Sequence, residues 1–330
     1  MVKAPMNKRR KTNKKSAQKL NKKAARTHFT NRDETQTDGQ SVKHASPHGH
    51  TDANDQQNRS ATDPKNTQQT IKDSNPQSPQ ITNKYSWIYG RHAVLAGLRN
   101  DVRTCHRLIM VSSIYKSLKN DLIDISNNRP AFPDIEIVDR EELDSLLPSS
   151  VVHQGICAEF DPLPAIFVED ICRHCAELDH AVVVVLDQVT DPRNIGAVLR
   201  SASAFNVQAV IIQERHAPAP DHMGAVAKAA SGALETVNLV RVTNIQRALK
   251  KLQQNDFWCV GFSGDAPETL AAASITGKTV VVFGSEGEGM RRLVEQSCDR
   301  LVKISISSEM ESLNLSNACA IALYELNKNG

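Results

Sequence analysis

The stretch AVVVVLDQVTDPRNIGAVLRSASAFNVQAVIIQ, residues 181–213, decides the class of fold. Its first six residues form a short continuous apolar run, which is typical of a strand buried on both faces of a parallel sheet. Residues 194–205 have the apolar spacing of a helix, and 207–213 form a second apolar run. A strand, a helix and a second strand in this order predict a parallel α/β unit.

The alternation continues on both sides of this stretch. Downstream, residues 179–330 are predicted to form a parallel sheet with helices on both faces, with further strands at 237–242, 257–262, 279–283 and 300–306 and helices at 224–235, 244–254, 288–296 and 312–328. Upstream, residues 83–162 are predicted to form a small α/β domain, with strands at 106–111, 134–138 and 153–160 and helices at 89–100, 114–126 and 140–147. Residues 163–178 are predicted to connect the two.

The first 80 residues have a different composition from the rest of the chain. They contain 16 Lys/Arg and 7 Asp/Glu, a net charge of +9, so the overall +3 leaves −6 for residues 81–330. Phe29 is the only Phe, Trp or Tyr before Tyr85, which leaves too little apolar surface for a core. Residues 1–82 are therefore predicted to be a disordered basic tail and linker. Twelve Lys/Arg and no acid in residues 1–32 indicate an arm for a polyanion; a solubilising tail and a transit peptide are the alternatives.

Several classes of protein are excluded by the same composition. No run approaches 18 apolar residues and the N-terminus has no apolar core, so neither a membrane span nor a secretory signal is expected. Seven scattered cysteines, an odd number, indicate a reducing, cytoplasmic environment. Cys172 and Cys175 form a CxxC without a second pair, and helical spacing explains it better than a zinc or redox site. No metal is expected.

Unusual residues follow three of the predicted strands, at the edge where parallel sheets bind ligands. After 181–187 come Asp191, Asn194, Gly196 and Arg200; helix capping by Asp191 or Asn194 and a solvated Arg200 are the simpler explanation. After 279–283 comes GSEGEGM, whose glycines let the backbone approach a ligand. Its carboxylates would repel phosphate, so a neutral or cationic ligand suits it better. After 300–306, Ser312 or Asn314 can cap the last helix.

Taken together and in this order, the three segments resemble the motifs of the SpoU (TrmH-like) family of RNA 2′-O-ribose methyltransferases. The family patterns N-x-G-x-x-x-R, a glycine-rich loop with a glutamate, and S-L-N-x-S-x-A match, in turn, Asn194, Gly196 and Arg200; Gly284 and Glu286; and Ser312, Leu313, Asn314, Ser316 and Ala318. The resemblance covers roughly residues 85–328, including IYGRHAV and VHQGI in the small domain. It is strongest to the bacterial enzymes that methylate a guanosine ribose in 23S rRNA. One departure is Ile304-Ser305-Ile306, where the family usually has I-P-M.

The resemblance implies a fold, a cofactor and a set of roles. The fold would be a SPOUT-type trefoil knot, which topology rules alone would not predict. S-adenosylmethionine would bind at Gly284, Ile304 and Leu313, and the protein would be a homodimer. Arg200 would stabilise the attacking ribose oxygen and grip the adjacent phosphate, while Asn194, Glu286, Asn314 and Ser316 would orient the site. The small domain would bind RNA.

Other functions remain open at this stage. A tRNA 2′-O-methyltransferase would carry the same motifs, and a non-catalytic rRNA-binding assembly factor could share the fold. A nicotinamide dehydrogenase is disfavoured because LDQVTDPRN, after the first strand of the large unit, lacks the glycines that a dinucleotide needs.

Overall fold

The computed structural model describes residues 85–129, 131–218 and 223–328. The predicted basic tail and linker, residues 1–82, and the basic arm within it lie outside the described residues.

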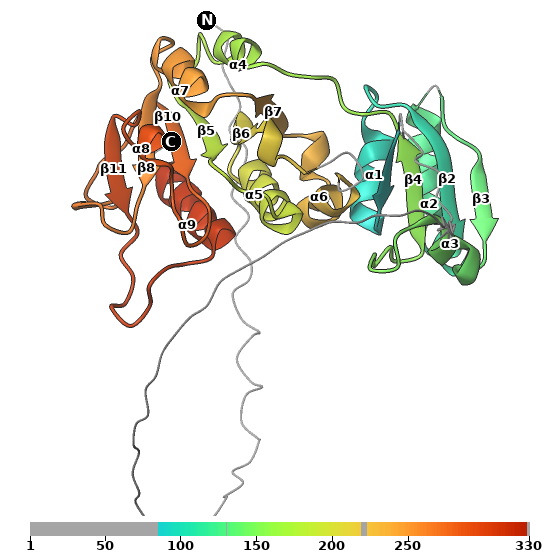
Figure 1. The fold of residues 1–330 in the computed structure, drawn as a ribbon. Helices are drawn as coiled ribbons and strands as arrows, with labels where there is room; N and C mark the ends of the chain where they lie inside the picture. The colour runs from blue at the N-terminus through green and yellow to red at the C-terminus, as the bar shows by residue number, and fades with distance from the viewer. Residues whose placement is uncertain (1–84, 130, 219–222, 329–330) are drawn as a thin grey trace, which may run out of the picture. The chain divides into compact units, whose positions relative to one another are not determined.

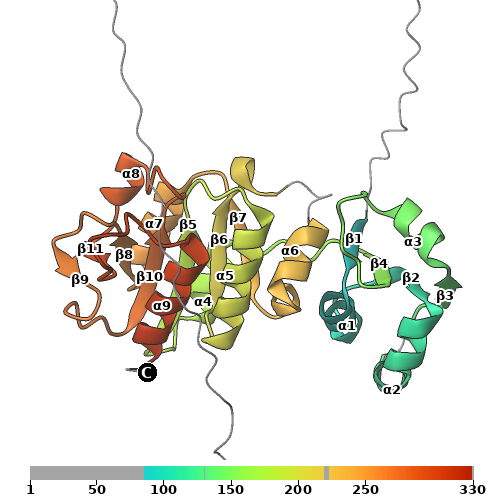
Figure 2. The same ribbon diagram turned by 90° about the horizontal axis from the view of Figure 1, so that it is seen from below.

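The first part of the described chain forms a four-stranded mixed sheet with the strand order β1-β4-β2-β3; Figure 1 shows β4, β2 and β3 side by side, and Figure 2 also labels β1. The central strand β2 pairs antiparallel with β4 and parallel with β3, and β4 pairs antiparallel with β1. The strands are β1 (Ser86–Tyr89), β2 (Cys105–Val111), β3 (Ile135–Val138) and β4 (Ile156–Phe160). The helices are α1 (Arg91–Arg99), α2 (Ser112–Asn128) and α3 (Arg140–Leu146). Strand β1 is an addition to the prediction.

The second part forms a seven-stranded sheet in the order β7-β6-β5-β10-β8-β11-β9, and every pairing in it is parallel. The prediction of an α/β fold with a parallel sheet is therefore confirmed. The strands are β5 (Ala181–Leu186), β6 (Ala209–Gln213), β7 (Asn238–Val242), β8 (Trp258–Phe262), β9 (Glu268–Thr269), β10 (Lys278–Phe283) and β11 (Arg300–Lys303). Strand β10, late in the chain, lies in the middle of the sheet.

Helices cover both faces of this sheet, and alternate valines of β5 point to each. Val182 and Val184 belong to the core under α5 (Pro192–Ala204), α6 (Met223–Ala230) and α9 (Leu315–Asn327). Val183 and Val185 belong to the core under α4 (Val168–His174), α7 (Ile245–Gln253) and α8 (Arg292–Glu295). Figure 2 shows α5, α6 and α9 together on one side of the strands.

Several predicted elements are shorter in the structure, and two of the differences have a local reason. The helix expected at 288–296 is only α8, because Ser285 and Gly289 form a β-bridge that holds the chain in a loop. The helix expected at 224–235 ends at Ala230, because Ser231 and Gly232 have positive φ angles, and a short 3₁₀ helix, η3 (Ala233–Glu235), follows. Strand β11 stops at Lys303 instead of continuing to residue 306.

The CxxC cysteines lie in the connecting segment. Cys172 is in α4 and Cys175 caps its C-terminus; both are buried, and burial raises the pKa of each thiol. Among the described residues, no group of three His, Cys, Asp or Glu side chains could hold a metal ion. Within the same residues no helix is long and apolar enough to cross a membrane.

Candidate active site

The three motif segments meet at the carboxyl edge of the large sheet. They are the start of α5, the loop after β10 and the start of α9. Asp191 caps α5 by accepting a hydrogen bond from the Arg193 amide at 2.8 Å, and Pro192 occupies the first helical position. Asn194 therefore lies in the first turn of α5 with its side chain at the sheet edge. Of the two capping residues that the sequence allows here, the structure selects Asp191.

Four predicted site residues form one hydrogen-bonded group, which we call the amide–carboxylate cluster: Asn194, Glu286, Asn314 and Ser316. Glu286 Oε1 accepts hydrogen bonds from Asn194 Nδ2 at 2.9 Å and from Asn314 Nδ2 at 2.7 Å. Asn314 Nδ2 also lies 3.2 Å from Asn194 Oδ1. The backbone amide of Leu315 donates to the same Glu286 oxygen at 3.2 Å. One exposed carboxylate thus ties together α5, the loop after β10 and the start of α9.

Asn314 has two roles at once. Its Oδ1 caps α9 by accepting from the amides of Ser316 at 2.9 Å and Asn317 at 3.4 Å. The Ser316 hydroxyl donates to the same oxygen at 2.5 Å. Helix capping, the simpler explanation for this motif, is therefore real, and it orients the Asn314 amide so that its Nδ2 faces Glu286.

The glycine-rich loop after β10 is a tight turn. The amides and carbonyls of Ser285 and Gly289 bond to each other at 3.1 and 3.0 Å, and Gly287 and Gly289 have φ angles of 90° and 68°. A Cβ atom on Gly284 would lie 1.8 Å from the carbonyl carbon of Gly289, so only glycine permits this closure. The turn projects Glu286 and Glu288 into solvent.

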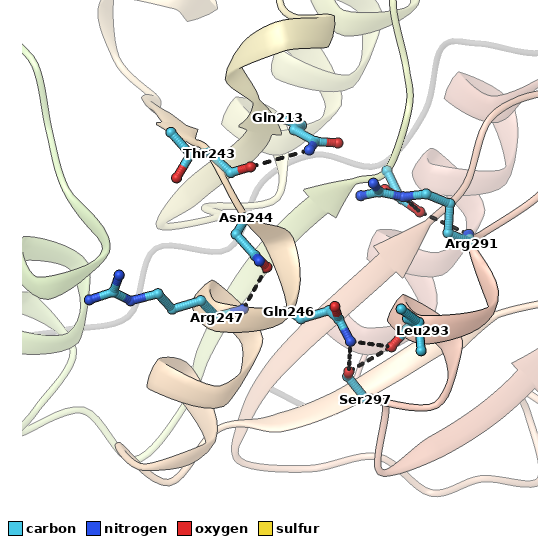
Figure 3. A network of polar contacts seen from close by, with 9 residues as sticks. Gln213, Thr243, Asn244, Gln246, Arg247, Arg291, Leu293 and Ser297 are labelled. Atoms are coloured by element: carbon cyan, nitrogen blue, oxygen red, sulfur yellow. Dashed lines mark hydrogen bonds and ion pairs between the residues drawn. The ribbon is translucent and has the colours of Figure 1, made fainter.

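Behind this loop lies an ion pair that the sequence analysis missed. Asp187, directly after β5, is fully buried, and its carboxylate accepts from Arg291 Nη2 at 2.6 Å, Arg291 Nε at 3.0 Å and the Arg291 amide at 2.9 Å. Figure 3 shows Arg291 in this arrangement. The pair fastens the end of the glycine-rich loop to β5. Its only sequence signal is an Asp directly after an uninterrupted apolar strand.

Arg200 stands apart from the amide–carboxylate cluster. It lies six residues after Asn194 on α5, it is exposed, and it makes no hydrogen bond or ion pair with another described residue. The structure therefore leaves its guanidinium available to a ligand. Gly196, the third residue of this motif, is a packing residue: a Cβ there would lie 2.4 Å from the Cβ of Ala229 on α6.

The three predicted cofactor residues follow the ends of β10 and β11 and precede α9. Gly284 and the side chains of Ile304 and Leu313 are half-buried, and no hydrogen bond joins these residues to one another. Nearby apolar groups include the stacked rings of Phe262 and Phe283, with centroids 4.5 Å apart. A tight glycine turn, apolar side chains and exposed carboxylates fit a flat aromatic group attached to a cationic centre, which is the chemistry of S-adenosylmethionine.

Comparison with known proteins gives a consistent result for both parts of the chain. Residues 181–324 match the SpoU rRNA Methylase family, and residues 87–165 match the family described as RNA 2′-O ribose methyltransferase substrate binding. The chain is 38% identical over 239 residues to the 23S rRNA (guanosine-2′-O-)-methyltransferase RlmB of Escherichia coli K12, covering 72% of this chain and 96% of that protein. It is 37% identical over 241 residues to the RlmB of Vibrio cholerae, covering 72% and 94%.

Among solved structures, the fold is similar to that of the SpoU methyltransferase AviRb from Streptomyces viridochromogenes in complex with AdoMet. The TM-score is 0.60 at 20% sequence identity, over 74% of this chain and 90% of that one.

Proposed function

Since the chain belongs to the SpoU rRNA methylase family, we propose that it methylates the 2′-hydroxyl of a guanosine ribose in 23S rRNA. It is an RNA 2′-O-methyltransferase whose cofactor is S-adenosylmethionine. The observation that supports the proposal best is the amide–carboxylate cluster, because three segments far apart in the sequence converge on one carboxylate oxygen of Glu286.

In the proposed mechanism, Arg200 contacts the RNA substrate, and the amide–carboxylate cluster orients the reacting groups. Bound S-adenosylmethionine would supply the methyl group of its sulfonium centre, with a neutral thioether as the leaving group. The Arg200 guanidinium stays protonated, so it stabilises the charge that develops on the ribose 2′-oxygen and holds an adjacent phosphate. Its exposure and its lack of a protein partner among the described residues suit that role.

The cluster residues orient the reacting groups. Glu286 accepts hydrogen bonds from the Asn194 and Asn314 side-chain amides, and the Ser316 hydroxyl donates to Asn314 Oδ1. Each of these polar groups therefore has a defined direction before the RNA binds. Such preorganisation lowers the barrier because no reorientation is needed during the reaction. Gly284, Ile304 and Leu313 are proposed to hold the cofactor, and the chain between β10 and α9 is proposed to form the family's trefoil knot.

We further propose a homodimer formed through the large domain. Two large apolar side chains of α9, Ile321 and Tyr324, are 43% and 56% exposed in the single chain. They lie on the same helix as Ser316, next to α5, which carries Arg200. A second copy that covers these side chains would place its own surface close to the site.

The test of this function uses labelled S-adenosylmethionine, with either undermodified 23S rRNA or bulk tRNA as acceptor. Label at one guanosine ribose of 23S rRNA is the expected result. Label in tRNA alone would overturn the substrate assignment and retain the reaction. Binding of S-adenosylmethionine by calorimetry without label in either RNA would favour the non-catalytic assembly factor.

A further inference from the structure

A large groove lies beside the active-site edge and is not used by the mechanism above. Its volume is about 1250 Å³. It is lined by β7, the edge strand of the large sheet, by α7 from its start to its last turn, and by residues 162–167 with the first turn of α4. The lining runs along β7 from Val237 and Asn238 at its amino end to Thr243 and Asn244 at its carboxyl end, so one end of the groove reaches the edge of the parallel sheet that carries the amide–carboxylate cluster.

The charges of this groove oppose those of the surrounding domains. Five cations line it, and four of them form no ion pair within the described residues: Arg241, Arg247, Lys250 and Lys251. Of the three described carboxylates that line the groove, Glu169 and Glu214 oppose these cations, whereas Glu235 is buried in an ion pair with the fifth cation, Arg103. The lining therefore has net positive charge, although residues 81–330 together carry −6.

Helix stability explains only part of this pattern. Lys250 and Lys251 lie in the last turn of α7, where cations interact favourably with the helix dipole. Arg247 lies in the first turn, where a cation is unfavourable, and no carboxylate of the described residues pairs with it. In Figure 3 its guanidinium extends away from the contacts that Gln246 makes with Leu293 and Ser297 on α8 and after it. The position of Arg247 is therefore better explained by an anion outside the protein.

We propose that this groove binds the phosphate backbone of the RNA substrate next to the methylated nucleotide. The proposal rests on the proposed function, since it assumes an RNA substrate. It gives the two folded domains, which together are acidic, a local positively charged surface for the RNA. Several unpaired cations along an extended groove suit a chain of phosphates, because each neutralised phosphate releases counterions. Arg241 and Arg247 provide planar donors, and Lys250 and Lys251 provide point charges.

The variant that tests the proposal is Arg247→Gln/Lys250→Gln/Lys251→Gln in the full chain, with 23S rRNA transcribed in vitro as the probe. Affinity is measured against salt concentration. The slope of log affinity against log salt should fall by about 2 to 3 if all three cations contact phosphates. The KM for RNA should rise about tenfold or more, while kcat and the Kd for S-adenosylmethionine stay unchanged.

Lys278→Gln is the matched control, compared with Lys250→Gln. Lys278 begins β10 and does not line the groove, so its loss removes the same charge elsewhere, together with a 2.8 Å hydrogen bond from Lys278 Nζ to the Ala176 carbonyl. Thermal unfolding verifies that each variant is folded. An unchanged slope and KM in the triple variant would overturn the proposal and point to another occupant, such as an acidic protein segment. The binding slope is measurable even if no RNA is methylated, so failure of the proposed function is separately visible.

Discussion

Asp187 and Glu286 are two carboxylates at the same edge of the large sheet, and their surroundings are opposite. Asp187 is fully buried and meets the Arg291 guanidinium through several hydrogen bonds. Glu286 is exposed, has no cationic partner among the described residues, and accepts only from amides. The buried carboxylate is neutralised inside the protein and fastens a loop. The exposed one keeps its charge at the surface, where a ligand can meet it.

The same contrast holds for two arginines, Arg200 in the first motif and Arg291 directly after the glycine-rich loop. Arg291 is committed to Asp187, whereas Arg200 is exposed without a protein partner in the described part of the chain. We therefore expect Arg200→Ala to lower methyl transfer by about 10²- to 10³-fold, because the developing charge loses its stabilising cation. Single-turnover transfer measures the rate, and calorimetry should show a near-normal Kd for S-adenosylmethionine.

Arg200→Lys is the conservative control and should restore only part of the rate, since a point charge lacks the planar donors. A loss of cofactor affinity as large as the loss of rate would contradict this role for Arg200.

Asp187→Ala should affect stability first. Arg291 would then keep a charge that is two-thirds buried without its partner, and the end of the glycine-rich loop would lose its attachment to β5. We expect the free energy of unfolding to fall by about 3 kcal/mol. Urea unfolding of this variant and of Arg291→Ala measures the effect; wild-type stability in both would show that the pair is not an anchor.

Gly284→Ala tests the glycine-rich loop, which carries Glu286 and is held to Asp187 through Arg291. A Cβ at this position would overlap the Gly289 backbone, so the turn must open. Overpacking of about 1 to 3 kcal/mol should weaken cofactor binding about tenfold or more. Gly264→Ala is the control, because no atom lies within 4 Å of its added Cβ. Equal cofactor affinity in both variants would separate the loop from cofactor binding.

Much of this arrangement could be predicted from the sequence where local chemistry determines it. The apolar runs of β5, β6 and β10 identify buried parallel strands, and the capping residues of α5 and α9 stand where helix starts need them. The four residues of the amide–carboxylate cluster were all predicted as site residues, although their contacts with each other came only from the structure.

The remaining features depend on contacts between distant residues. Asp187 and Arg291 are 104 residues apart, and neither position has a local pattern that indicates the pair. Helix α8 is short because the chain before it closes on itself between Ser285 and Gly289, which helical spacing cannot show. Gly196 belongs to a family motif, yet its contact is with α6, so a motif residue can serve packing alone.

Removal of residues 1–80 should have the smallest effect on the active site. Their net charge of +9 predicts a non-specific, salt-dependent contribution to RNA affinity. The truncated chain should show a reduced slope of log affinity against log salt and methylate the same nucleotide as the full chain. An unchanged slope would leave solubility as the function of this segment, and a shifted nucleotide would give it a part in target selection.

The most direct test of the contrast between the two carboxylates is a paired measurement on Glu286→Ala, with Glu286→Gln as the conservative variant. We expect Glu286→Ala to change the free energy of unfolding by about 0.5 kcal/mol or less, as is usual for exposed side chains. Single-turnover methyl transfer should fall about 10²-fold, because Asn194 and Asn314 lose their common acceptor, with partial rescue by Glu286→Gln. A normal rate, or a destabilisation as large as that of Asp187→Ala, would contradict the orienting role of Glu286.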